Sequence, residues 1–251
     1  LLQNGIISIT DVPDNFKLSD KQWAQVQVAR DGEPRIDKAA IHQRLSTLEY
    51  PLYFLDYESL QYAIPLFDGV KPYQQMVFQW SLHLLDAPDG ALHHREYLAD
   101  GTCLPTWDFA ATLHANIPDH GGTVVVWNKS FETTRNKELG EMHPEFANFM
   151  ASLNNRVFDL MEIFQQQLYM HPSDRGSYSI KQILPILAPE LSYDDLEINQ
   201  GMLAAIRWFQ LATGKIPEHY KATTLENMRK YCHLDTLAMV EIYKQLILNC
   251  Q

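Results

Sequence analysis

The order of strand and helix signals after residue 50 constrains the fold of this chain more than any other feature. Strand signals lie at residues 52–58, 75–86, 93–100, 121–128 and 156–160. Helix signals lie at residues 106–116, from about 131 onward, and at 225–248. The first three strands are separated by short turns, which predict an antiparallel meander. A meander followed by alternating helix and strand predicts an α/β fold with a mixed sheet flanked by helices.

Residues 1–50 have a different character. They predict two helices, at about 19–30 and 36–48, and carry no catalytic pattern. We interpret them as a helical linker or as the end of an upstream domain, with one domain following at 51–251. The chain begins without Met, in mid-pattern, which predicts that it is part of a longer protein.

Composition excludes several classes of protein. Hydrophobic residues make up 46% of the chain, enough for one large core. The net charge is -11 without a long basic run, so a polybasic arm for duplex binding is absent. The three cysteines have no zinc-binding spacing and predict reduced thiols in a cytoplasm. No apolar run is long enough for a membrane span, so no membrane association is expected.

Polar residues interrupt the predicted structure at three places. Asp56 and Glu58 end a buried strand and point to the same side, because strand side chains alternate. Asn128 ends the valine-rich strand, and Glu132 follows at the start of a helix. Tyr231 and Asp235 are four residues apart and share one face of the last helix.

Converging carboxylates repel one another unless a cation lies between them. Asp56, Glu58, Glu132 and Asp235 therefore predict a site for two Mg²⁺ or Mn²⁺ ions, which prefer oxygen ligands. Each piece alone has an ordinary alternative. The strand-end acids suit a solvated edge, an Asn before a helix suits a cap, and the tyrosine and aspartate suit a polar pair.

In order and spacing, the three pieces resemble the exonuclease motifs of the DEDD superfamily of 3′–5′ exonucleases, which have a ribonuclease-H-like fold. Asp56-Tyr57-Glu58 matches the first motif, and Asn128-Lys129-Ser130-Phe131-Glu132 matches the second. Tyr231 and Asp235 match the third motif in its tyrosine subclass. The resemblance covers roughly residues 51–250. Glu132 departs from the usual aspartate, which leaves the second metal the least defined part of the site.

The chain also resembles an uncharacterised bacterial domain family through "YPLYFLDYESL", "NKSFETTR", "GSYSIKQILP" and "YCHLDTLAMV". Members of that family are often fused behind a RecB-like nuclease domain. This resemblance implies an upstream nuclease domain as a partner within a longer chain, joined through residues 1–50.

The superfamily resemblance implies a role for each matched residue. Asp56 would bridge both ions, Glu58 and Asp235 would complete the first ion's ligands, and Glu132 would serve the second. Tyr231 would orient the attacking water. The implied activity is hydrolysis of single-stranded DNA or RNA to nucleoside 5′-monophosphates. The alternative is a catalytically weak or inactive nucleic-acid-binding or interaction domain of a larger nuclease.

Further residues are candidates for binding substrate. Tyr57 has a ring suited to stacking on bases, although an aromatic at a strand end is more often part of a core. Asn128 comes with the second motif, and Lys181 is a candidate phosphate contact or an ordinary surface lysine. Asp159 is expected to cap a helix rather than to join the site. His83 is expected to be a hydrogen-bonded histidine on a polar strand face rather than a metal ligand.

Overall fold

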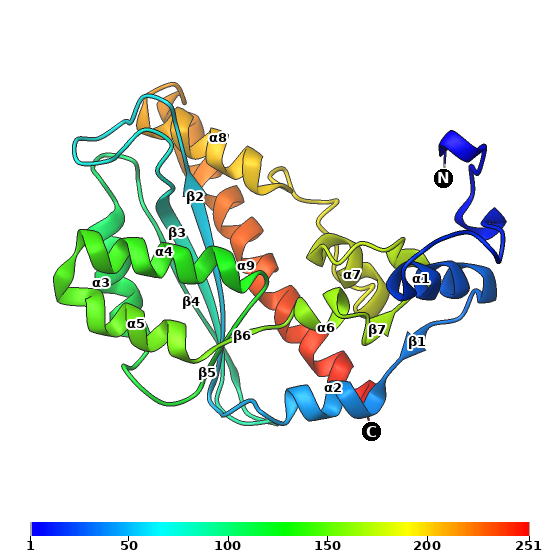
Figure 1. Ribbon diagram of the computed structural model, residues 1–251. Helices are drawn as coiled ribbons and strands as arrows, with labels where there is room; N and C mark the ends of the chain where they lie inside the picture. Colours follow the sequence, from blue (N-terminus) through cyan, green and yellow to red (C-terminus); the bar gives the residue numbers. More distant parts are fainter. Residues whose placement is uncertain (1, 251) are drawn as a thin grey trace. The chain divides into compact units, whose positions relative to one another are not determined.

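A computed structural model describes residues 2–250 and divides them into two compact units (Figure 1). The larger unit comprises residues 48–160 and 192–241, and the smaller comprises 2–47, 161–191 and 242–250. The larger unit begins near the boundary expected at residue 50. The assignment of residues 51–251 to one exonuclease domain stays a prediction.

A five-stranded mixed sheet forms the centre of the larger unit. Its strands are β2 (Leu52–Leu60), β3 (Met76–Leu85), β4 (Leu92–Leu98), β5 (Thr123–Val126) and β6 (Val157–Asp159). Their order is β4-β3-β2-β5-β6, with β2, β3 and β4 antiparallel and β2, β5 and β6 parallel. The predicted meander and mixed sheet are confirmed, and the arrangement is compatible with a ribonuclease-H-like fold.

Helices cover both faces of this sheet. They are α3 (Thr106–Asn116), α4 (Lys129–Met142), α5 (Ala147–Asn155), α8 (Gly201–Ala212) and α9 (Glu218–Cys250), with a short 3₁₀ helix at Pro144–Phe146. Helices α3, α4 and α5 lie on one face, and α9 lies on the other (Figure 1). The three valines of β5 are fully buried, as expected for a parallel strand covered on both sides.

Alternation along β2 divides its side chains between these two faces. Tyr53, Leu55 and Tyr57 pack into the hydrophobic cluster that the residues of α3, α4 and α5 complete. Asp56 and Glu58 therefore point to the opposite face, which α9 covers. Burial of the apolar set fixes this register, because a slip of one residue would place the carboxylates in the apolar cluster.

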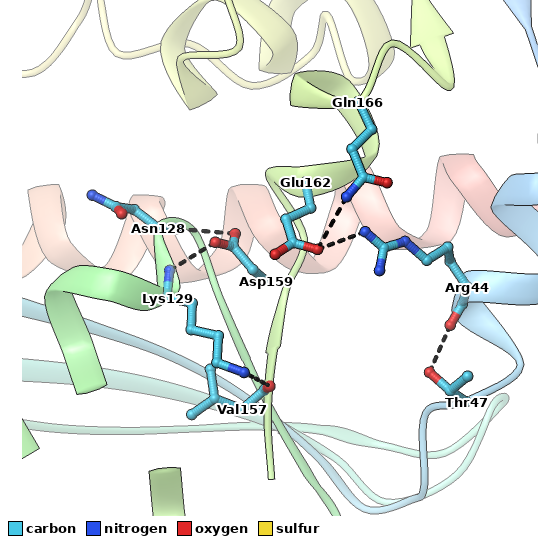
Figure 2. Close-up of polar contacts among 8 residues, drawn as sticks. All are labelled: Arg44, Thr47, Asn128, Lys129, Val157, Asp159, Glu162 and Gln166. Carbon is cyan, nitrogen blue, oxygen red and sulfur yellow. Dashed lines mark hydrogen bonds and ion pairs between the residues drawn. The ribbon is translucent and has the colours of Figure 1, made fainter. Parts of the chain in front are cut away.

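The smaller unit is mostly helical. It contains α1 (Asp20–Asp31), α2 (Lys38–Leu45), α6 (Glu162–Gln165), α7 (Ile180–Leu187), strands β1 (Arg35–Ile36) and β7 (Tyr169–Met170), and 3₁₀ helices at Leu2–Asn4, Ile9–Asp11 and Pro172–Asp174. Strands β1 and β7 pair antiparallel. Arg44 of α2 donates to Glu162 of α6 at 2.5 Å, and Gln166 also donates to Glu162 (Figure 2).

The last helix begins earlier than the sequence pattern predicts. Helix α9 starts at Glu218, directly after Pro217, instead of near Leu225. Thr223 and Glu226 have the spacing of a capping box, but both residues lie inside the helix and do not begin it. Proline is common at the beginning of a helix, where a missing N–H is not needed. Pro217 was therefore the better start signal.

Each of the three cysteines is a free thiol. Among the described residues, no helix combines the length and the apolar character that crossing a membrane requires.

Candidate metal centre

Strand β2 and helix α9 bring the first and third sequence motifs together. Cys232 of α9 is fully buried, and its Sγ lies 3.6 Å from Asp56 Oδ2. Ligand atoms of Asp56, Glu58 and Cys232 all lie within 4.8 Å of one another. Glu58 and Asp235 are each 7% exposed, so these acids lie in a largely desolvated place. The structure thus gathers side chains that are far apart in the sequence.

Glu132 supplies a further buried carboxylate from the first turn of α4. Its side chain is 2% exposed, and its Oε2 has no hydrogen-bond partner among the described residues. Burial, and then the negative charge of Asp56, raises the pKa of Glu132 well above its usual range. The start of a helix favours negative charge, but that effect is modest beside full burial.

The negative charges of three acids raise the pKa values of both Tyr231 and Cys232. Burial raises the pKa of Tyr231 most strongly, followed by the charges of Asp235, Glu58 and Asp56. The Tyr231 hydroxyl therefore keeps its proton at neutral pH. Burial and the charges of the same three acids also raise the pKa of the Cys232 thiol. Three carboxylates thus act on both side chains at once.

Asp159 organises the beginning of α4 (Figure 2). Its carboxylate accepts hydrogen bonds from the backbone N–H groups of Asn128 at 3.2 Å and Lys129 at 2.8 Å. Asp159 therefore caps the helix from β6, and the expected capping role is confirmed. Asn128 has a left-handed backbone with φ of 99°, and its own side chain makes no capping hydrogen bond.

Two neighbours of the acids were not identified from the sequence. The Tyr193 hydroxyl donates to Asp235 Oδ1 at 2.7 Å. Gly201 begins α8, and a methyl group placed there would lie 3.4 Å from Glu58 Oε2 and 3.8 Å from the Tyr231 hydroxyl. Tyr193 belongs to the acidic, turn-rich stretch "SYDDLEINQG" at residues 192–201. A single tyrosine in a turn-rich stretch carries no periodic signal that would reveal its partner.

A cleft of about 380 Å³ adjoins Glu58. Its lining includes Tyr62, Phe131 and Gly201, together with Met202 and Ile206 of α8. Met202 is 73% exposed and Ile206 is 40% exposed, so α8 presents apolar surface here. The volume and the mixed lining fall in the range of small-molecule sites.

The three residues proposed for substrate binding lie in different places. Tyr57 is 3% exposed in the core, where its hydroxyl donates to Asn136 and its ring contacts Phe109 at 5.0 Å between centroids. This placement matches the core alternative and leaves little surface for a base. Asn128 is exposed at the start of α4. Lys181 belongs to α7 of the smaller unit, and a phosphate-binding role for it stays a prediction.

The donor atoms at this centre fit a divalent cation that prefers oxygen ligands. Carboxylate oxygens are the protein ligands of Mg²⁺ and Mn²⁺, and buried carboxylates need a compensating charge. The unpartnered Oε2 of Glu132 is the kind of atom that such an ion would satisfy. A thiol beside Asp56 adds one softer donor to the set.

A domain family described as "Domain of unknown function (DUF2779)" matches residues 53–179. The match covers slightly more than half of the chain, so the chain belongs to this family. The expected relation to an uncharacterised domain family is thereby confirmed. The matched range includes Asp56, Glu58 and Glu132, and it ends before Tyr231 and Asp235.

Three mycoplasma proteins are similar to the chain, and all are named as uncharacterised. "Uncharacterized protein UU173" of Ureaplasma parvum is 26% identical over 234 residues, covering 85% of this chain and 33% of that protein. The MG366 homolog of Mycoplasma pneumoniae is 26% identical over 77% of this chain and 32% of its own length. MG366 of Mycoplasma genitalium is 25% identical over 75% of this chain and 31% of its own length. The chain thus spans about a third of these relatives. No solved structure matches it.

Proposed function

We propose that this member of the DUF2779 family is a metal-dependent 3′–5′ exonuclease that releases nucleoside 5′-monophosphates from single-stranded DNA or RNA. The observation that carries the proposal is Glu132, a buried carboxylate whose Oε2 has no partner among the described residues. Asp56 lies close enough for its charge to raise the pKa of Glu132. Two such groups are compatible with a stable fold when a cation compensates their charges.

Four carboxylates would hold the metal: Asp56, Glu58, Glu132 and Asp235. When bound, two Mg²⁺ or Mn²⁺ ions lower the pKa of a water molecule and neutralise charge that develops on the phosphate. The three sequence motifs that these residues belong to support the same function. Glu132 is one methylene longer than the aspartate usual in the superfamily, which extends its reach from the start of α4.

Tyr231 and Tyr193 have separate roles in this proposal. Tyr231 keeps its proton at neutral pH, because burial and the surrounding acids raise its pKa. It therefore serves as a hydrogen-bond donor that orients the attacking water or a phosphate oxygen, and not as a general base. Tyr193 is a positioning residue, because its hydroxyl holds one oxygen of Asp235 at 2.7 Å.

The cleft beside Glu58 would receive the terminal nucleotide. Phe131, Met202 and Ile206 provide apolar contact surface within its lining. Stacking of a base on the Phe131 ring would be tolerant of base identity, since every base has a π-face. A binding mode of this kind suits an enzyme that shortens strands of any sequence. It also needs few cations, in agreement with the net charge of -11.

The test uses single-stranded DNA and RNA labelled at the 5′ end, incubated with Mn²⁺ or with EDTA. The wild type is compared with Glu132→Gln, which keeps the side-chain shape and removes the charge. Glu141→Gln is the matched control, because Glu141 lies on the same helix and its side chain is 66% exposed. We expect a ladder of 3′-shortened products with Mn²⁺ for the wild type and Glu141→Gln, and at least a hundredfold slower shortening for Glu132→Gln.

Two results contradict the proposal. Cleavage that continues unchanged in EDTA, or that opens circular strands, would indicate a different nuclease chemistry. Tight binding of the labelled strands without shortening, with either Mg²⁺ or Mn²⁺, would instead identify a non-catalytic binding domain.

A further inference from the structure

Three histidines form a second cluster in the larger unit, separate from the cluster of acids. His83 lies on β3, His94 lies directly opposite it on β4, and His233 lies on α9. Their ring centroids are 4.6 Å apart for His83 and His94, 4.7 Å for His83 and His233, and 4.3 Å for His94 and His233. One ring nitrogen from each residue lies within 4.8 Å of the other two.

A chain of hydroxyl groups orients two of these rings. Thr236 lies inside α9, and its Oγ1 is within hydrogen-bond distance of the carbonyl oxygens of Cys232 at 3.4 Å and His233 at 3.1 Å. Thr236 Oγ1 also forms hydrogen bonds with Ser81 Oγ and with His83 Nδ1, each at 2.8 Å. Ser81 Oγ in turn forms a hydrogen bond with His94 Nε2 at 3.0 Å.

These contacts engage one ring nitrogen of His83 and one of His94. When His83 Nδ1 and His94 Nε2 donate in these contacts, the lone pairs are on His83 Nε2 and His94 Nδ1. Histidines that bind metals donate their second ring N–H to a neighbouring acceptor in the same way. Ser81 and Thr236, both fully buried, would be the acceptors in that arrangement.

We propose that His83, His94 and His233 bind one transition-metal ion of the zinc class. Neutral imidazole is a favoured ligand of Zn²⁺, and sites with three protein ligands keep a fourth position for water or an exogenous group. Mg²⁺ and Mn²⁺ prefer oxygen, so the two clusters select different ions. His94 and His233 are half-buried and border a cleft of about 410 Å³, which gives the ion a route from solvent.

The proposed ion would join the β3–β4 hairpin to α9. His233 lies between Tyr231 and Asp235 in the sequence of that helix. Occupation of the histidine site would therefore restrain the helix segment that supplies Tyr231 and Asp235. This inference does not depend on the exonuclease proposal, because the binding of zinc to the histidines is measured without a nucleic acid substrate.

Calorimetric titration of the metal-free protein with Zn²⁺ tests the site. Excess Mg²⁺ is present throughout, so that Mg²⁺ competes with Zn²⁺ for the acidic centre. The variants are His94→Ala and His233→Ala, both at half-buried positions where truncation leaves no large cavity. His93→Ala is the matched control, because His93 is the exposed neighbour of His94 on the same strand. Cys232→Ser tests whether the thiol beside Asp56 binds the zinc instead.

We expect one Zn²⁺ per chain in the wild type, at least tenfold weaker binding in His94→Ala and His233→Ala, and unchanged binding in His93→Ala and Cys232→Ser. Circular dichroism of each variant verifies folding, and a zinc-dependent rise in melting temperature that both histidine variants lose gives a second readout. Equal zinc affinity in all variants, loss of binding in Cys232→Ser alone, or no zinc binding in the presence of Mg²⁺ would overturn the proposal.

Discussion

Removing the charge of Glu132 should stabilise the metal-free protein, which is the reverse of the usual effect of a core substitution. The Glu132 side chain is 2% exposed, and its Oε2 lacks a hydrogen-bond partner among the described residues. An unsatisfied buried polar group destabilises a fold by about 1–3 kcal/mol, and more when it is charged. Glu132→Met removes the charge and the oxygen together, so we expect its free energy of unfolding in EDTA to increase by about 1–3 kcal/mol.

The stability advantage of the Glu132 variants should depend on pH, because the pKa of Glu132 is raised in the folded state. The pKa of Glu132 is raised in the folded state, by burial first and by Asp56 second, so the folded state binds the proton more tightly than the unfolded state. That contribution to stability is complete below the unfolded pKa and is lost as the pH rises through the folded pKa. The advantage of Glu132→Gln and Glu132→Met over the wild type should therefore be larger at about pH 8 than at about pH 5.

Thermal melts in EDTA measure the effect. In a chain of this size each kcal/mol shifts the melting temperature by about 2–4 °C, so Glu132→Met should melt several degrees above the wild type at the higher pH. Glu141→Gln, an exposed position on the same helix, should stay within about 0.5 kcal/mol of the wild type. A Glu132→Met protein that melts clearly below the wild type in EDTA, or an advantage that does not change with pH, would refute the reasoning.

Three other substitutions separate catalysis from packing. Tyr231→Phe should lower turnover at least tenfold and leave the Mn²⁺ affinity measured by calorimetry unchanged, since the hydroxyl is proposed as a hydrogen-bond donor and not as a metal ligand. A loss of Mn²⁺ affinity as large as the loss of turnover would contradict this role. Asp159→Ala should destabilise the protein by about 0.5–2 kcal/mol in denaturant melts, because it removes the cap of α4, and no loss would show that water replaces the cap. Tyr57→Phe should lower stability by about 1 kcal/mol without changing Mn²⁺ affinity, since it removes only the buried hydrogen bond to Asn136.

Local pattern predicted most of the sheet and the placement of the acids. Helix α3 has the expected bounds, and the three meander strands lie within about two residues of their expected positions. The same period-two rule that puts Asp56 beside Glu58 also puts Tyr57 on the opposite face. Applying it to Tyr57 would have placed that side chain in the core from the sequence alone.

Contacts between distant segments were not accessible in this way. Tyr193 reaches Asp235 across 42 residues, and Ser81 reaches Thr236 across 155. No spacing rule connects such positions, because their approach depends on how α9 crosses the sheet. His83 was correctly expected to be hydrogen-bonded, and its bond to Thr236 confirms that. The approach of His94 and His233 to His83 was not predicted, because no spacing rule connects these positions.

The long separation along the chain between the parts of the acidic centre has a consequence for biosynthesis. Asp56 and Cys232 are in contact although they are 176 positions apart in the sequence. A ribosome would thus have to deliver almost the whole of this chain before α9 could close over β2. Contacts between such remote positions form late, since closing a long loop carries a large entropic penalty. The strands of the sheet can therefore form before α9 is synthesised, and the acidic centre is completed only when α9 packs against β2.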